Sequence, residues 1–175
     1  VMMCKDAKKG KGDDLFLFFD EEGNAQDVKA YHVNEYIQEA SGEKFTAKDF
    51  RTWAATWKCG SRLAKVSAGI SGNELKSWLE DLRQIEGIEK LISEDEKIPI
   101  ETDTERNKAM LAVIDTVAAD LGNTRAVCRS SYIHPFFMDS FLDGSLQSKW
   151  TEAKKKGKIK GMEIDEATTL HALQG

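Results

Sequence analysis

Two short stretches of the sequence hold side chains whose types suit chemistry on a phosphate ester. One reads Asn-Thr-Arg-Ala-Val-Cys-Arg-Ser-Ser-Tyr from Asn123 to Tyr132, and the other, Thr-Ala-Lys-Asp-Phe-Arg-Thr-Trp, contains Arg51. A tyrosine hydroxyl has an ordinary pKa of about 10 and is a competent nucleophile only where cationic donors favour its ionised form. An arginine offers a permanent charge and a planar fork of donors to two phosphate oxygens, and an asparagine amide offers a neutral donor. These residue types could therefore supply a nucleophile and charge stabilisation in phosphoryl transfer.

Each of these side chains also has an ordinary structural explanation. A tyrosine in a helical protein is most often a packed amphipathic side chain, and Arg51 alone would most often form a surface ion pair. Asn123 follows a glycine, where asparagine commonly terminates a helix. His134, two residues after the tyrosine, could be a base, but we interpret it as ordering the turn before the next proline. The choice depends on the elements that position these residues.

The hydrophobic pattern of the first seventy residues predicts one short strand and two helices. The apolar run over residues 15–19 is the one good strand candidate. A helix ending at Ser41-Gly42 follows from helical spacing of Val33, Tyr36, Ile37 and Ala40. Thr46, with Asp49 three residues later, predicts the cap of the next helix. We expect that helix to bury the stripe Phe50, Trp53, Ala54 and Trp57 and to end or bend near Gly60.

The rest of the chain is predicted to be helical apart from one exposed connection. A helix is expected over residues 73–92, which Gly87 could interrupt, followed by an acidic, exposed connection over 93–104. The clearest helix is predicted by a stripe that ends at Gly122 and comprises Met110, Val113, Ile114, Val117, Ala118 and Leu121. Shorter helices are expected over residues 126–131, 136–142 and 146–156, with a weak one over 163–173.

Charge and composition limit the classes of partner. The formal net charge of −5 alone would argue against DNA, but acid is concentrated in residues 13–22 and 93–105, while 154–160 is basic. No apolar run could span a bilayer, no signal peptide is evident, and three cysteines without paired spacing suggest reduced thiols. We therefore predict a soluble, cytoplasmic protein without a metal site, on whose surface a basic face could coexist with an acidic back.

The two motif blocks, in this order, resemble those of type IB DNA topoisomerases. Thr46 to Trp53 is similar to the family segment that contributes a catalytic arginine, matched here by Arg51. Leu121-Gly-Asn-Thr, Ala126-Val-Cys-Arg and Ser131-Tyr-Ile-His-Pro are similar to the segment with the active-site tyrosine, matched by Tyr132. The position nine residues before that tyrosine is histidine in poxviral members and asparagine in bacterial-type members. Because it is Asn123 here, the resemblance is to the bacterial-type branch.

The resemblance implies a fold, an activity and a set of partners. The fold would be the mainly α catalytic domain shared by topoisomerase IB and tyrosine recombinases, with at most a short N-terminal strand. Tyr132 would form a 3′-phosphotyrosyl link in double-stranded DNA, assisted by Arg51 and Asn123, and the cut strand would swivel and be rejoined, relaxing supercoils. The enzyme would be a monomer that needs no cofactor, metal or ATP, associated with the nucleoid if bacterial. The predicted DNA-binding residues are Lys48, Arg125 and Arg129.

The sequence departs from the family pattern in ways that leave alternatives open. No residue matches the family's catalytic lysine, its further arginine or its N-terminal domain, so we expect a C-terminal fragment whose isolated activity is in question. We divide it into a flexible lead-in (1–14), a catalytic portion (15–150) and a basic extension (151–175). The alternatives are a non-catalytic truncated relative that binds DNA and a tyrosine recombinase, although the histidine-rich box and His-x-x-Arg segment of the recombinases are absent.

Overall fold

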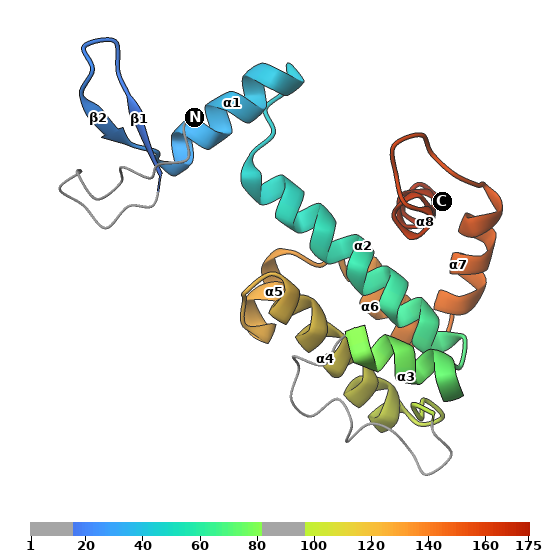
Figure 1. The fold of residues 1–175 in the computed structure, drawn as a ribbon. Coiled ribbons are helices and arrows are strands. Elements are labelled where there is room, and N and C mark those ends of the chain that lie inside the picture. Colours follow the sequence, from blue (N-terminus) through green and yellow to red (C-terminus); the bar gives the residue numbers. More distant parts are fainter. Residues whose placement is uncertain (1–15, 82–96) are drawn as a thin grey trace. The chain divides into compact units, whose positions relative to one another are not determined.

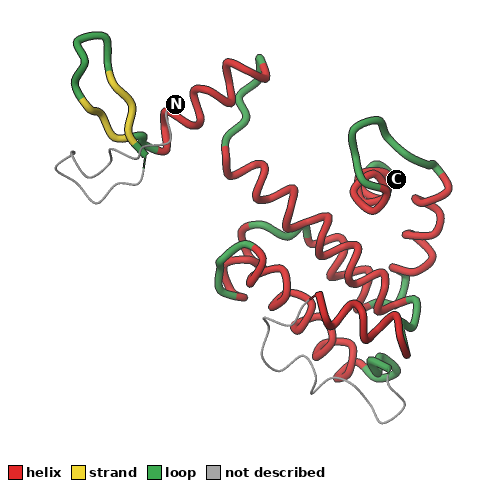
Figure 2. The backbone as a smooth tube through the Cα atoms, in the orientation of Figure 1, coloured by secondary structure: helices red, strands yellow, loops and turns green. Residues whose placement is uncertain are grey.

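The structure, a computed structural model, describes residues 16–81 and 97–175 and comprises two compact units. The first unit extends to Phe50 and the second runs from Arg51 to Gly175. The described residues form eight helices and one two-stranded sheet, so the predicted mainly α fold with a minor extended element is confirmed (Figures 1 and 2).

The described part of the first unit contains a β-hairpin in place of the single predicted strand. Strands β1 (Leu17–Phe19) and β2 (Ala25–Asp27) are antiparallel, with Leu17 opposite Asp27. The turn between them is held by Asp20, whose carboxylate accepts the Asn24 backbone N–H at 2.8 Å. The second strand was missed because Ala-Gln-Asp has neither apolar alternation nor β-branched residues. Its backbone pairing follows from the turn rather than from its own side chains.

Helix α1 (Ala30–Ser41) ends where the sequence predicted. Its C-terminal cap, Gly42, has a φ of 71° and donates its N–H to the Gln38 carbonyl, a left-handed geometry that favours glycine. The predicted apolar stripe is nevertheless open to solvent, and Tyr36 is 71% exposed. Periodicity therefore identified the helix but not a buried face.

Helix α2 (Ala47–Ser67) begins at the predicted cap. The Asp49 carboxylate accepts both the backbone N–H and the hydroxyl of Thr46, at 2.8 and 2.7 Å. Asn34 adds a second restraint, because its side-chain oxygen accepts the Ala47 N–H at 3.0 Å.

The predicted core face of α2 is wrong. Phe50 is 59% exposed, and Trp53, Ala54 and Trp57 are only part-buried. The buried face consists mainly of small residues: Ala55, Thr56, Cys59, Gly60, Ser61, Leu63, Ala64 and Val66. Small side chains let neighbouring helices approach closely, so packing here follows shape rather than the largest apolar groups.

The predicted end or bend at Gly60 is also wrong. The helix continues to Ser67, and Gly60 lies in its interior against the ring of Phe137. A Cβ at position 60 would lie 2.9 Å from Phe137 Cε1. This glycine therefore serves a close approach between helices, not a break in one.

The later helices agree closely with the sequence prediction. Their observed bounds are α3 (Gly72–Asp81), α4 (Asp103–Asp120), α5 (Arg125–Ser131), α6 (Pro135–Leu142), α7 (Leu146–Lys155) and α8 (Ile164–Leu173). The predicted α4 stripe is confirmed, since Met110, Val113, Ile114, Val117 and Ala118 are all buried. The part of the predicted helix beyond residue 81 lies outside the described residues, as do the lead-in over 1–14 and residues 93–96 of the connection.

The described end of the acidic connection is not wholly exposed, contrary to the prediction. Lys97 forms an isolated bridge with Ser71, and Ile98 is only 7% exposed because it belongs to the core cluster. The composition of the segment predicted exposure because Ile98 follows acidic residues. Its apolar side chain is nevertheless buried, since burial removes apolar surface from water.

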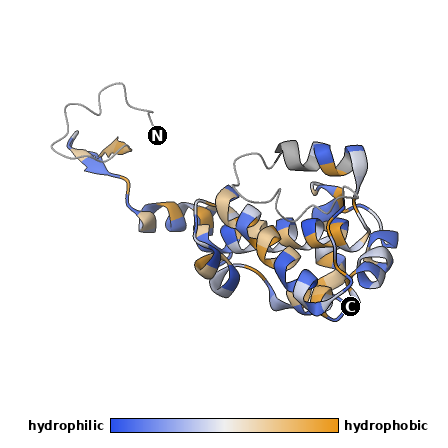
Figure 3. Ribbon diagram, turned by 90° about the horizontal axis from the view of Figure 1, so that it is seen from below, coloured by the Kyte–Doolittle hydropathy of each residue, from blue (hydrophilic) through white to orange (hydrophobic). Residues whose placement is uncertain are grey.

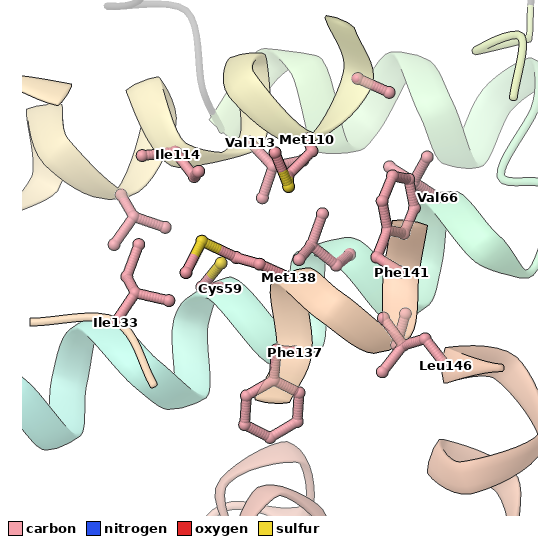
Figure 4. Close-up of a cluster of buried hydrophobic side chains, with 14 of the residues drawn as sticks. Cys59, Val66, Met110, Val113, Ile114, Ile133, Phe137, Met138, Phe141 and Leu146 are labelled. Atoms are coloured by element: carbon pink, nitrogen blue, oxygen red, sulfur yellow. The ribbon is translucent and has the colours of Figure 1, made fainter. Parts of the chain in front are cut away.

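The core of the second unit is built mainly from α2, α4 and α6. In Figure 4, Met110 and Val113 of α4 and Met138 of α6 point towards one another, with Cys59 of α2 beside them. Figure 3 shows the corresponding alternation of hydrophobic and hydrophilic residues along the helices. The chain's last helix is attached through α2, where Trp53 Nε1 donates to Glu166 and the Ser61 hydroxyl donates to Asp165, both at 2.5 Å. These two bonds join α8 to α2 in addition to its packing against α7.

Candidate active site

The end of α4 fixes the backbone of Asn123. Leu121 is the C-cap, and Gly122 follows with a φ of 63°. The Gly122 N–H donates to the Ala119 carbonyl at 3.1 Å, and the Asn123 N–H donates to the Ala118 carbonyl at 2.8 Å. This pair of bonds is a Schellman motif, which closes the helix and sets the direction in which the next residues leave.

Tyr132 lies at the opposite end of the short helix that follows. Thr124 caps the start of α5 by accepting the Val127 N–H, and Tyr132 is its C-cap, donating its N–H to the Cys128 carbonyl at 3.1 Å. The eight residues between Asn123 and the part-buried Tyr132 thus form one turn-and-helix unit. His134 caps α6, because its Nδ1 accepts the Phe136 N–H at 3.3 Å, as expected for a residue that orders this turn.

Arg51 brings α2 against both ends of this unit. Its Nη2 donates to the Leu121 carbonyl at 2.6 Å, and its Cζ lies 5.7 Å from the centre of the Tyr132 ring. The bond occupies one of the unpaired carbonyls at the end of α4, where a cation is also favoured by the helix dipole. Arg51 is exposed and uses one of its five N–H donors here, so its fork remains open to a ligand.

The Asn123 side chain carries an unusual feature. Its Nδ2 is buried and has no hydrogen-bond partner among the described residues. A buried amide donor left without a partner costs about 1–3 kcal/mol, so such groups are rare in native structures. A phosphate oxygen that accepted a hydrogen bond from this Nδ2 would therefore remove the cost of the unpaired donor. To do so, it would have to displace the atoms that cover the amide.

The three predicted DNA-binding residues differ in their surroundings. Arg129 is exposed in the last turn of α5, and Lys48 is exposed in the first turn of α2, within the first unit. Arg125 instead donates two hydrogen bonds to the Asp115 carboxylate, with its Nε 2.6 Å from Oδ1. The bonds to this carboxylate raise the pKa of the Arg125 guanidinium. Arg125 would have to break these two hydrogen bonds to Asp115 before it could bind a phosphate through the same donors.

Sequence reasoning missed two groups that hold α2 against the site. Asp120 Oδ2 accepts from Lys58 at 2.7 Å and from Arg62 at 2.6 Å, which ties α2 to the end of α4. Thr56 is buried on α2, and its hydroxyl donates to the Tyr132 carbonyl and accepts the His134 N–H. The spacing of Lys58 and Arg62 could have suggested a shared acid, but nothing in the sequence distinguishes Thr56 from any other helical threonine.

The cysteines near the site are unsuited to nucleophilic chemistry. Cys59 and Cys128 are both buried and free. Burial raises the pKa of the Cys59 thiol to about 12, and burial also raises the pKa of Cys128 despite the nearby charge of Arg51. A thiol needs its thiolate form to attack, so these side chains act as small apolar core residues.

Within 16–81 and 97–175, no cluster of three or more His, Cys, Asp or Glu residues could hold a metal ion. No helix in the same ranges has the length and apolar character needed to cross a bilayer.

The second unit is mainly α-helical and places Arg51 beside Tyr132, and comparison with known families defines the class of protein. The family model for the catalytic core of eukaryotic DNA topoisomerase I matches residues 1–159. Because the match covers most of the chain, the protein belongs to this family of type IB topoisomerases. A comparison with curated proteins found no match.

Proposed function

We propose that this topoisomerase cleaves and rejoins one strand of double-stranded DNA through Tyr132. The observation that carries the proposal is the position of Arg51, whose guanidinium lies against the Tyr132 ring while donating to the carbonyl two residues before Asn123. A cation beside the nucleophile can stabilise the negative charge that would develop on the phosphate oxygens during attack. Family membership supports action on DNA topology in general.

The proposed reaction is a reversible transesterification. Tyr132 Oη attacks the phosphorus, and the new bond from Oη to the 3′-phosphate forms as the bond from phosphorus to the 5′-oxygen breaks. In net terms, the proton lost by the phenol is balanced by the proton that the leaving 5′-oxygen gains. Arg51 and the Asn123 amide stabilise the charge on the non-bridging oxygens. The cut strand swivels, and the 5′-hydroxyl then attacks the phosphotyrosine to restore both the strand and the phenol. Because one phosphoester replaces another, no ATP is required, and arginine supplies the charge that a metal would otherwise provide.

The remaining assignments belong to the same proposal. Asn123 favours the bacterial-type branch of the family, acting as a monomer, and Lys48, Arg125 and Arg129 are the proposed contacts to the DNA backbone. The proton donor for the 5′-oxygen is not assigned to a residue of this chain. We retain the division into a lead-in, a catalytic portion over 15–150 and a basic extension.

A suicide DNA substrate, from which the short 5′-hydroxyl fragment dissociates after cleavage, tests the nucleophile. The wild-type chain should form a covalent adduct on denaturing gels, whereas Tyr132→Phe should reduce adduct formation at least about 1000-fold because the attacking oxygen is gone. DNA affinity, measured by fluorescence anisotropy, should change less than about 2-fold, since one hydroxyl contributes little to phosphate-dominated binding.

Tyr36→Phe provides the matched control, because it removes a hydroxyl from an exposed tyrosine outside the site. An adduct that persists in Tyr132→Phe would refute the assignment of the nucleophile. DNA binding by the wild type without any adduct would instead favour the non-catalytic alternative.

A further inference from the structure

Thr56 occupies a position between α2 and the segment that carries Tyr132. Its side chain is buried, with the residue 3% exposed, and lies on the same helix as Arg51, five residues further along. Its Oγ1 donates to the Tyr132 carbonyl at 3.1 Å and accepts the His134 N–H at 3.2 Å. One hydroxyl therefore binds the backbone on both sides of Ile133.

These two bonds fix the exit of the chain from α5. The carbonyls at the end of a helix lack partners within it, and the segment 132–134 leaves α5 and enters α6 without regular structure. A hydroxyl has one donor and two acceptor sites, so Thr56 can satisfy both backbone groups at once. Ile133, between them, is buried in the core, which adds a third point of attachment.

Arg51 and Thr56 together give α2 two points of contact with Tyr132. Arg51 lies over the ring, and Thr56 holds the backbone carbonyl of the same residue. Both side chains project from α2. The hydrogen bond from Thr56 fixes the backbone of Tyr132 relative to this helix, and it thereby fixes the distance between the phenol and the Arg51 guanidinium. A misplacement of about 1 Å between reacting groups can cost about 100-fold in rate.

We propose that Thr56 is a positioning residue that sets Tyr132 against Arg51 for attack on the phosphate. The proposal rests on the assignment of Tyr132 as nucleophile, and it adds a residue that touches neither DNA nor the phenolic oxygen. It predicts that the hydroxyl, rather than the volume of the side chain, matters for the rate of cleavage.

The test compares Thr56→Val, which keeps the shape but removes the hydroxyl, with Thr56→Ser, which keeps the hydroxyl. Single-turnover adduct formation on the suicide substrate should slow about 10- to 100-fold in the valine variant and stay within about 3-fold of wild type in the serine variant. DNA affinity should be unchanged in both. Amide exchange at His134, followed by NMR, should accelerate at least about 10-fold in Thr56→Val only, because that N–H loses its acceptor.

Thr168→Val is the matched control for simple loss of a buried hydroxyl. Thr168 is fully buried on α8, and its Oγ1 donates within its own helix to the Ile164 carbonyl at 2.7 Å. This variant should leave both the cleavage rate and the His134 exchange unchanged. A similar slowing in Thr168→Val, or wild-type rates in Thr56→Val, would overturn the proposal.

The two proposals fail in different ways. If the wild type forms no adduct, the assignment of Tyr132 as nucleophile is lost, and with it a positioning role in cleavage. If the wild type cleaves DNA but Thr56→Val cleaves as fast and protects His134 equally well, only the role of Thr56 is lost.

Discussion

A single residue, Arg51, links the parts of the candidate site. Its guanidinium can donate to the Leu121 carbonyl and still present further N–H groups towards a phosphate, because its donors point in several fixed directions. A lysine could keep the charge but not this fork. Five donors on one planar group therefore explain how an exposed side chain can organise a helix end and remain available for chemistry.

Asn123 presents a case in which stability and activity should separate. Replacing it with leucine removes the buried Nδ2 that lacks a partner among the described residues, so the variant should be more stable by about 1 kcal/mol in urea unfolding. The backbone bonds of the Schellman motif remain, and an apolar side chain at this position often packs against the preceding helix. Cleavage of the suicide substrate should nevertheless slow at least about 10-fold, because a donor to the phosphate is lost.

Asn107→Leu is the control for this change. The Asn107 amide already donates to the Asp103 carbonyl at 2.8 Å, so its removal relieves no unpaired donor. Asn107→Leu should therefore not increase stability, and it should leave the rate of cleavage at the wild-type value. If Asn123→Leu cleaves DNA at the wild-type rate, the amide takes no part in charge stabilisation.

Among the elements, the sequence identified helices better than it identified their faces. The α4 stripe and its terminating glycine predicted both the helix and its buried side, because the apolar residues there are the ones that pack. In α2 the large aromatic residues repeat at helical spacing as well, yet smaller residues on another face meet α6. Periodicity reports that a helix has a distinct side, whereas the choice of partner depends on shapes that only the folded chain brings together.

The same limit applies to the site. Arg51, Asn123 and Tyr132 could be singled out because their residue types carry chemistry and their blocks resemble a family. Thr56 could not, since its role arises from a contact between residues 76 positions apart. Likewise, the sequence predicted that Arg125 binds DNA but did not indicate its hydrogen bonds to Asp115.

Close packing between α2 and α6 makes Gly60 a test of the fold. Alanine is favoured over glycine in a helix by about 1 kcal/mol, but its Cβ would lie 2.9 Å from a Phe137 ring that is fully buried. Overpacking of a rigid core costs about 1–3 kcal/mol, so we expect Gly60→Ala to lose about 1–2 kcal/mol of unfolding free energy in urea titrations.

A smaller side chain at position 137 should separate the two effects. In a Phe137→Leu background the added methyl has more room, so the cost of Gly60→Ala should shrink and could change sign as the helix preference takes over. Equal costs in both backgrounds would show that the Phe137 ring is not what excludes a side chain from position 60.

At the scale of the whole molecule, the excess of acid makes the fold sensitive to low pH. Several carboxylates in the second unit have lowered pKa values because they accept hydrogen bonds, among them Glu105 at the start of α4 and Asp143 after α6. A group whose pKa is lower in the folded state stabilises that state above its unfolded pKa. This contribution is lost as the pH falls through the folded value. The chain should therefore lose stability progressively below about pH 4.

Asp120 allows this prediction to be tested at one site. Burial would raise the pKa of its carboxyl group, but Lys58 and Arg62 outweigh burial and bring the pKa below its ordinary 3.8. Asp120→Asn should therefore cost about 1 kcal/mol near neutral pH, because both cations lose the negative charge of the acceptor that they share. The difference from wild type should narrow once the pH falls below about 4, because the unfolded wild-type chain then binds a proton that the folded chain resists.

Urea unfolding of wild type and Asp120→Asn between pH 2 and pH 7 measures this difference, with Asp139→Asn as a control that removes an exposed carboxylate from α6. The control should run parallel to wild type, since Asp139 forms no salt bridge with any residue in 16–81 or 97–175. The same variant also connects stability to chemistry, because Asp120 ties α2, and so Arg51, to the end of α4 that leads to Asn123. A constant stability difference across the whole pH range would mean that Asp120 acts through its shape and not through its charge. In that case the attachment of α2 would have to be sought in its packing alone.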